Sequence, residues 1–174
     1  MKESNNIVLA LDGHDGSGKT TLAKLLAEEI GGIYVRPFAG NQGLKLLQYA
    51  EQKEYETLPA FGHQLIQKQL EAHQNQVLVF DRHWMTVFSL LPEAYWSGSA
   101  WHPLPHTTLC FSGMECTLER LKERSEEKYG EAYHAHYLEM YLKLGKRFNA
   151  NILMTDQDDI GKCLVKLVEW YKSL

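Results

Sequence analysis

Features of secreted and membrane proteins are scarce in this chain of 174 residues. Its three cysteines, Cys110, Cys116 and Cys163, form no C-x-x-C pair, so we expect neither a disulfide framework nor a paired-cysteine motif. No apolar run reaches the roughly 18 residues that a membrane span needs. The polar N-terminal segment leads directly into an apolar run, which predicts that no signal peptide is present. These absences favour a cytoplasmic protein without a membrane partner.

An excess of positive charge is also missing. The formal net charge is −4, which argues against a general nucleic-acid binder because such proteins neutralise phosphates with lysine and arginine. A nucleotide remains compatible with this charge, since one loop and a few arginines can hold it. Apolar residues make up 44% and charged residues 23% of the chain, as in ordinary globular proteins. The length predicts one domain over residues 1–174.

The most informative segment runs from Gly13 to Thr20 and fits the phosphate-binding pattern G-x-x-x-x-G-K-[ST]. A short apolar run precedes it at 7–11, and a helical pattern follows at 22–30, as this loop requires. Glycines let the backbone approach a phosphate, and Lys19 can reach the β- and γ-phosphates. The Thr20 hydroxyl can ligate Mg²⁺. The ATP-binding residues that we predict are Gly13, Asp15, Gly16, Ser17, Gly18, Lys19, Thr20 and Thr21.

Strand-like and helical patterns alternate along the whole chain. Strands are predicted at 7–11, 33–35, 77–80, 107–111 and 151–154. Helices are predicted at 19–30, 43–53, 59–73, 84–91, 116–124, 132–149 and 158–172. Such alternation predicts an α/β fold with a parallel sheet and helices on both faces. An aromatic segment with glycine and proline, 95–106, is predicted to be a loop.

A second motif places an acid directly after an apolar run, in the segment from Val77 to His83. An Asp at the end of such a strand can hold Mg²⁺ or accept the proton of an attacking hydroxyl, which is a role for Asp81. Arg82 can contact a substrate phosphate with two parallel hydrogen bonds. The alternative is that Asp81 caps the next helix and Arg82 forms a surface ion pair. The neighbouring phosphate loop favours the functional interpretation.

A third motif is the charged segment 118–128, in which Arg120 and Arg124 share one helix face. A mobile arginine can neutralise the charge that develops during phosphoryl transfer. We therefore predict catalytic roles for both arginines in a lid of about 120–131. A solvated helix face with internal ion pairs is the alternative.

Together the motifs make the chain similar to the thymidylate kinase family of P-loop nucleoside monophosphate kinases, and more distantly to the deoxynucleoside kinases. The similarity rests on the segment 12–21, on Asp81-Arg82-His83, and on 118–121 with Arg124. It implies a three-layer P-loop fold whose five parallel strands have the order 2-3-1-4-5, and transfer of the γ-phosphoryl of ATP with Mg²⁺. It also implies that Asp15 contacts the sugar of the acceptor and that Arg82 contacts its phosphate or the reaction centre. In some members of the family a basic residue of the phosphate loop assists catalysis, and His14 stands at that position.

The chain departs from the family pattern near the predicted acceptor site. Arg36-Pro37-Phe38 stands where the family often has R-E-P or R-F-P, and no glutamate base follows, so Asp81 is the expected acid. The segment 61–69 contains no arginine, although the family usually presents one to the acceptor phosphate there. His63, Gln64 or Lys68 could substitute, but a neutral glutamine cannot replace a guanidinium.

Aromatic side chains after the second motif could stack on an acceptor base, or could pack in the core and on a homodimer surface. They are Trp84, Phe88, Tyr95, Trp96 and Trp101. The substrate-binding residues that we predict are Asp15, Arg36, His63, Arg82 and Trp84. The predicted catalytic residues are Lys19, Asp81, Arg82, Arg120 and Arg124, and the predicted metal ligands are Thr20 and Asp81.

Three functions remain open from the sequence. The first is an ATP-dependent kinase of a nucleoside monophosphate. The second is a kinase of a nucleoside or another small alcohol, which the missing arginine favours. The third is a nucleotide-binding module without catalysis. In each case the expected partners are nucleotides and small molecules.

Overall fold

The computed structural model describes residues 6–96 and 101–174. Its centre is one sheet of five strands in the order β2-β3-β1-β4-β5, with every neighbouring pair parallel. The strands are β1 (Ile7–Asp12), β2 (Ile33–Val35), β3 (Val77–Asp81), β4 (His106–Phe111) and β5 (Asn151–Met154). The predicted strand order is confirmed.

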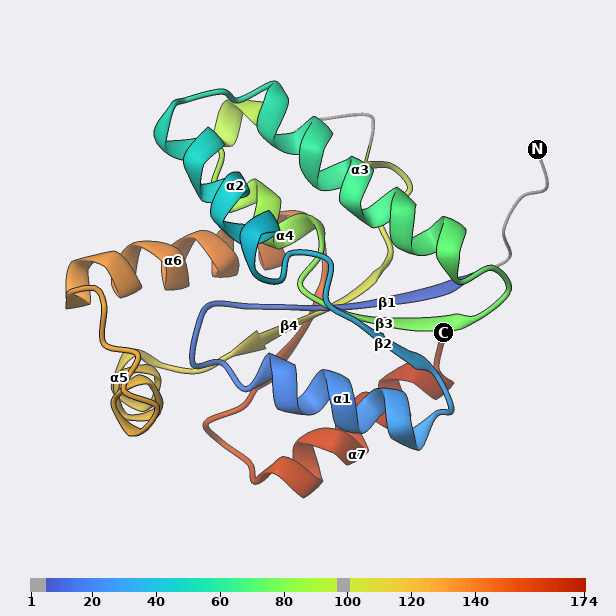
Figure 1. Cartoon of the computed structure of the whole chain (residues 1–174). Helices are drawn as coiled ribbons and strands as arrows, with labels where there is room; N and C mark the ends of the chain where they lie inside the picture. Colours follow the sequence, from blue (N-terminus) through green and yellow to red (C-terminus); the bar gives the residue numbers. More distant parts are fainter. Residues whose placement is uncertain (1–5, 97–100) are drawn as a thin grey trace.

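Helices cover both faces of the sheet, as predicted (Figure 1). On one side lie α1 (Lys19–Glu29) and α7 (Ile160–Lys172). On the other side lie α2 (Asn41–Glu51), α3 (Thr57–Ala72), α4 (Trp84–Phe88) and α6 (Glu131–Arg147). The helix α5 (Met114–Glu123) follows β4, and a short 3₁₀ turn, η1 (Glu93–Tyr95), follows α4.

The two layers of helices explain why the strands read as continuous apolar runs. A parallel strand with helices on both faces buries side chains pointing either way. In β1 the side chains of Leu9, Ala10 and Leu11 are all fully buried. One apolar cluster joins the sheet to α1 and α7, and the other joins it to α3, α4 and α6.

Sheet register brings the two sequence motifs to the same edge. Leu11 of β1 pairs with Asp81 of β3, and the Arg82 amide donates to the Leu11 carbonyl oxygen at 3.0 Å. Both strands end there, so the loop after β1 and the acid after β3 face one region of space. This is the carboxyl edge, where open α/β sheets bind ligands.

The aromatic residues of α4 and of the segment after it mostly enter the core. Trp84 is 1% exposed and its indole N–H donates to Thr107, so the predicted substrate contact of Trp84 is wrong. Trp96 and Trp101 are also buried, and Tyr95 is exposed. The predicted loop 95–106 includes 97–100, which lie outside the described residues. Within 6–96 and 101–174, we find no helix with the length and apolar character to span a membrane.

Candidate active site

The phosphate loop, residues 13–18, connects the end of β1 to the start of α1. Gly13 has φ 152°, and a Cβ there would lie 2.2 Å from the carbonyl oxygen of Cys110, so only glycine fits. Gly18 caps α1 in the left-handed conformation with φ 80°. The loop therefore presents backbone amides at the N-terminus of a helix, which is an anion-binding arrangement.

Lys19 is buried at the start of α1, with 5% exposure. Its Nζ donates to the carbonyl oxygen of His14 at 3.2 Å and lies 4.0 Å from Asp15 Oδ1. Burial, followed by the positive charge of Arg82, lowers the pKa of Lys19 to about 8, against the opposing charges of Asp15 and Asp81. A phosphate at this loop would supply a second anionic partner for the buried ammonium, beside Asp15.

Asp81, at the end of β3, has two carboxylate oxygens in different situations. Oδ2 accepts a hydrogen bond from the Tyr34 hydroxyl at 2.8 Å and lies 3.9 Å from Arg36 Nε. Oδ1 is buried and has no hydrogen-bond partner among the described residues. Burial and the hydrogen bond to Asp81 raise the pKa of Tyr34, so this hydroxyl keeps its proton. One oxygen of Asp81 is thus held in place, while the other is buried without a hydrogen-bond partner among the described residues.

Arg82 occupies the left-handed region with φ 78°, a conformation that is costly outside glycine. Its Nη2 pairs with Asp15 Oδ1, and its Nη1 lies 3.4 Å from the carbonyl oxygen of Gly13. Burial opposes the charge on Asp15, but Arg82 and Lys19 outweigh it and lower the pKa of Asp15 to about 2. The strained backbone therefore aims the guanidinium at the phosphate loop.

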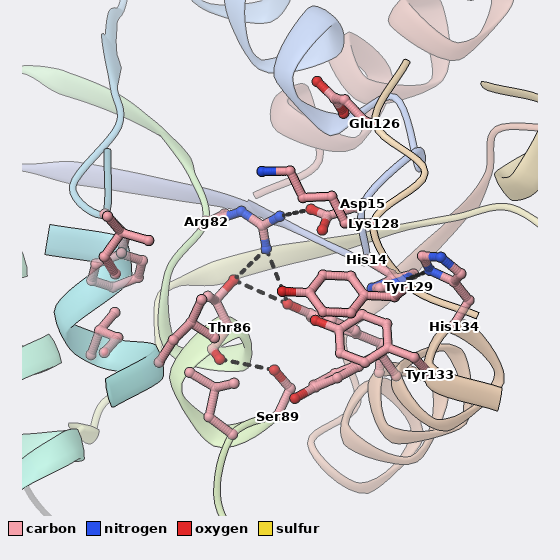
Figure 2. Close-up of a pocket in the computed structure, with 18 of the residues that line it drawn as sticks. His14, Asp15, Arg82, Thr86, Ser89, Glu126, Lys128, Tyr129, Tyr133 and His134 are labelled. Atoms are coloured by element: carbon pink, nitrogen blue, oxygen red, sulfur yellow. Dashed lines mark hydrogen bonds and ion pairs between the residues drawn. The ribbon is translucent and has the colours of Figure 1, made fainter. Parts of the chain in front are cut away.

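A half-buried chain of hydroxyls also contacts Arg82, and Figure 2 shows its link to Thr86. Nη1 also donates to Thr86 Oγ1 at 3.3 Å and to Tyr141 Oη at 3.4 Å. Asp12 accepts from the Thr86 hydroxyl at 2.7 Å, and a carboxylate can only accept. The Tyr141 hydroxyl must therefore donate to Thr86, across 3.1 Å. The hydroxyls of Tyr141 and Thr86 therefore both donate in the direction of Asp12.

Two cavities flank the phosphate loop. The first has a volume of about 440 Å³ and lies between α2, α4, α6 and the segment after α5. Apolar side chains of α2 form one wall and tyrosines form the opposite one, with Asp15 and Arg82 at its inner end (Figure 2). Its lining includes His14, Phe38, Leu44, Leu47, Lys128, Tyr129, Tyr133, His134, Tyr137 and Tyr141.

The second cavity, of about 670 Å³, lies on the other side of the loop beside α5 and α7. Its lining includes Gly18, Thr21, Arg120, Arg124, Thr155 and Ile160. The two cavities share no lining residue and are separated by the phosphate loop. A molecule in each could therefore place a phosphate at the same loop.

Most of the predicted residues surround the loop, but Arg120 does not sit in a mobile lid. It belongs to α5, and it donates to the carbonyl oxygens of Gly16 at 3.0 Å and Thr155 at 2.7 Å. The segment without helix between α5 and α6 is 124–130, shorter than the predicted lid of 120–131. Arg124 is exposed at the C-cap of α5 and lines the second cavity.

His63 lies away from the first cavity. It is on α3, and its ring contacts Trp101 with centroids 5.4 Å apart. No α3 residue lines that cavity, so the predicted acceptor contact of His63 finds no support in the geometry. Arg36 is 55% exposed and lies beside Asp81, where a charged acceptor group could reach it.

Several residues of the site were missed in the sequence. Tyr34 at β2 and Thr86 on α4 carry no local motif and become visible only through their hydrogen bonds. The tyrosines of the first cavity did carry a signal, because their spacing of four puts them on one helix face. They are Tyr133, Tyr137 and Tyr141 of α6, whereas Tyr129 lies in the segment 124–130 before that helix.

The sheet order and the loop define a protein of the P-loop class. A family model described as an AAA domain matches residues 8–105, more than half of the chain. The chain therefore belongs to this AAA domain family.

Individual relatives are kinases. A probable thymidylate kinase from Metallosphaera sedula is 28% identical over 164 residues, covering 84% of this chain and 83% of the relative. The structure of deoxyadenosine kinase from M. mycoides with bound dATP matches with a TM-score of 0.69 and 16% identity, over 95% of this chain and 99% of that one. Shikimate kinase from Acinetobacter baumannii, in complex with shikimate, matches with a TM-score of 0.63 and 16% identity, over 98% and 95% of the two chains. The predicted fold and the predicted similarity to thymidylate kinases are confirmed.

Proposed function

We propose that this protein is an ATP-dependent kinase that transfers the γ-phosphoryl group to a nucleoside monophosphate. The observation that carries the proposal is the unpartnered, buried Oδ1 of Asp81 beside the phosphate loop. A carboxylate with one oxygen fixed and one free suits the orientation of an attacking oxygen. The probable thymidylate kinase among the relatives supports this reaction class.

The donor would bind across the phosphate loop with its base in the cavity beside α5 and α7. The loop amides and Lys19 would hold the β- and γ-phosphates. Arg120 keeps the loop in shape through Gly16, while Arg124 is free to contact the donor. Charge on the transferred group would be neutralised by Lys19 and Arg82 in a site that excludes much of the water.

The acceptor would occupy the cavity between α2 and α6. Its ring would lie between the leucines of α2 and the tyrosines of α6, because flat rings pack well on both kinds of surface. Asp15 would contact the sugar, while Arg82 and Arg36 would reach the acceptor phosphate. Asp81 would then align the attacking oxygen with the γ-phosphorus.

The side chains present fit Mg²⁺. Mg²⁺ prefers oxygen ligands and keeps several waters, and the Thr20 hydroxyl and the free Oδ1 of Asp81 are oxygen ligands of this kind. When bound, the ion supplies charge neutralisation between the β- and γ-phosphates.

A nucleoside is the second candidate acceptor. The cavity receives no side chain from α3, and that helix has no arginine to hold an acceptor phosphate. Arg82 is already shared among Asp15, Gly13, Thr86 and Tyr141. These two observations favour an acceptor with less negative charge.

A direct test incubates the purified protein with ATP, Mg²⁺ and a panel of nucleoside monophosphates and nucleosides, and detects products by mass. We expect one or more monophosphates to gain a phosphoryl group, and Lys19→Ala to lower the rate by about 10²–10³. Gain by nucleosides alone would favour the second candidate. Gain by no member of the panel, with ATP still bound, would contradict the proposed reaction.

A further inference from the structure

A buried pair of histidines joins the phosphate loop to α6. His14 Nε2 and His134 Nδ1 are 2.8 Å apart, although 120 positions separate them in the sequence. The two side chains are 5% and 3% exposed. Burial lowers the pKa of His14 to about 4, so its ring is neutral at neutral pH and can exchange one hydrogen bond with its partner.

The backbone of His14 is part of the donor site. Its carbonyl oxygen accepts from Lys19 Nζ and from the amide of Ser17, each at 3.2 Å. The next residue, Asp15, is the one that pairs with Arg82. Fixing the ring of His14 therefore restrains the His14 carbonyl, to which Lys19 and the Ser17 amide of the phosphate loop are bonded.

His134 lies in the first turn of α6, directly after the segment 124–130. Its amide donates to the carbonyl oxygen of Gly130 at 3.4 Å. Tyr137, one turn further, stacks on His14 with an interplanar angle of 7° and centroids 5.7 Å apart. The start of α6 thus holds the His14 ring by a hydrogen bond with His134 at its edge (Figure 2) and by the ring of Tyr137 against its face.

We propose that His134 is a positioning residue, which holds the phosphate loop in its donor-binding conformation through the hydrogen bond to His14. The proposal rests on the proposed function in one respect, that the donor is ATP. Two apolar side chains of similar size would fill this space without the cost of burying ring nitrogens. The proposal explains why two polar rings are buried here instead. The hydrogen bond offsets that cost only while both nitrogens remain aligned.

The pair uses a different nitrogen of each ring, which permits a sharp test. An asparagine at 134 keeps a polar atom near the position of Nδ1, whereas a glutamine places it near Nε2. At position 14 the order reverses, because His14 uses Nε2. If the two rings only filled space, asparagine would not be the better replacement at position 134 while glutamine is the better one at position 14.

The first measurement is the calorimetric Kd of a non-hydrolysable ATP analogue with Mg²⁺. We expect His134→Leu and His14→Leu to weaken binding about three- to tenfold. His134→Asn and His14→Gln should stay within about twofold of the unsubstituted protein, while His134→Gln and His14→Asn resemble the leucine variants. His136→Leu is the matched control, since His136 is exposed on the same helix.

The second measurement needs no ligand. Hydrogen exchange of the loop amides at 13–18 should be faster in His134→Gln than in His134→Asn, and unchanged in His136→Leu. Equal exchange and equal Kd in the two amide variants would overturn the proposal, even if the leucine variants failed to fold. If the unsubstituted protein bound no ATP analogue, the proposed function would fail, and hydrogen exchange alone would decide the role of His134.

Discussion

The two carboxylate oxygens of Asp81 have different roles, one structural and one proposed to be chemical. Oδ2 is held by the Tyr34 hydroxyl, and Oδ1 has no partner among the described residues. Replacing the carboxylate by an amide keeps the shape but removes the charge and one acceptor. The residue is therefore suited to a substitution that changes chemistry more than packing.

We expect Asp81→Asn to lower kcat by about 10²–10⁴, because a positioned carboxylate contributes a factor of this size. KM for ATP should change much less, since the donor is held mainly by the loop and Lys19. Steady-state kinetics with the acceptor found in the product screen measure both parameters. A variant with unchanged kcat would show that Asp81 has no part in the reaction.

At the scale of elements, two polar anchors, the buried Asp12 and the half-buried Arg120, fix the helices around the loop. Asp12 ends β1 and accepts from the amides of His83, Met85 and Thr86 as well as from the Thr86 hydroxyl. It thereby joins the first strand to the start of α4. Arg120 joins α5 to the loop and to the end of β5.

Asp12→Asn should lower the free energy of unfolding by about 2–4 kcal/mol, because an amide nitrogen would face backbone donors in a buried site. Urea denaturation measures this change. Asp159→Asn is a suitable comparison, since Asp159 caps α7 at an exposed position and an amide can still cap. A smaller loss for Asp12→Asn than for Asp159→Asn would contradict the assignment of Asp12 as an anchor.

Arg120 and Arg124 form a matched pair with different expected effects. Arg120→Met should lower the free energy of unfolding by about 1–3 kcal/mol through the loss of its hydrogen bonds to Gly16 and Thr155. Arg124→Met should change it by less than about 0.5 kcal/mol, because Arg124 is exposed. Thermal unfolding of the two variants side by side measures both changes. Equal decreases in the free energy of unfolding would contradict a structural role for Arg120 that Arg124 does not share.

At the scale of the whole molecule, two buried histidines make stability depend on pH. Burial lowers the pKa of His14 to about 4 and that of His83 to about 3, from an ordinary value of 6.5. Between the ordinary pKa of 6.5 and these lowered values, the unfolded chain binds more protons than the folded one. The folded state therefore loses stability as the pH falls below about 6.5.

The free energy of unfolding should therefore decrease from pH 7 to pH 5, with up to about 1.4 kcal/mol per pH unit from each histidine. Urea denaturation at several pH values gives the slope. His83→Phe should flatten it, whereas His136→Phe at an exposed position should not. A stability that stays constant between pH 7 and pH 5 would contradict the buried, neutral state of these rings.

Local patterns were enough to predict the sheet, because glycine-rich turns and apolar runs have short-range physical causes. The phosphate loop and the Asp81-Arg82 pair came from the same kind of signal. The hydroxyl chain from Tyr141 to Asp12 and the contact of His14 with His134 could not be predicted, since they join positions far apart in the sequence. Trp84 was misplaced because an aromatic residue beside a motif fits a pocket wall and a core equally well.

The fate of the γ-phosphoryl group tests the central claim most directly. Single-turnover reactions with γ-labelled ATP and Mg²⁺ would be followed with and without the acceptor pool, in the unsubstituted protein and in Asp81→Asn. We expect the label to move to an organic acceptor in the unsubstituted protein, and to remain on bound ATP in the variant. Release of the label as inorganic phosphate, at the same rate whether or not an acceptor is present, would contradict a site in which donor and acceptor meet between the phosphate loop and Asp81.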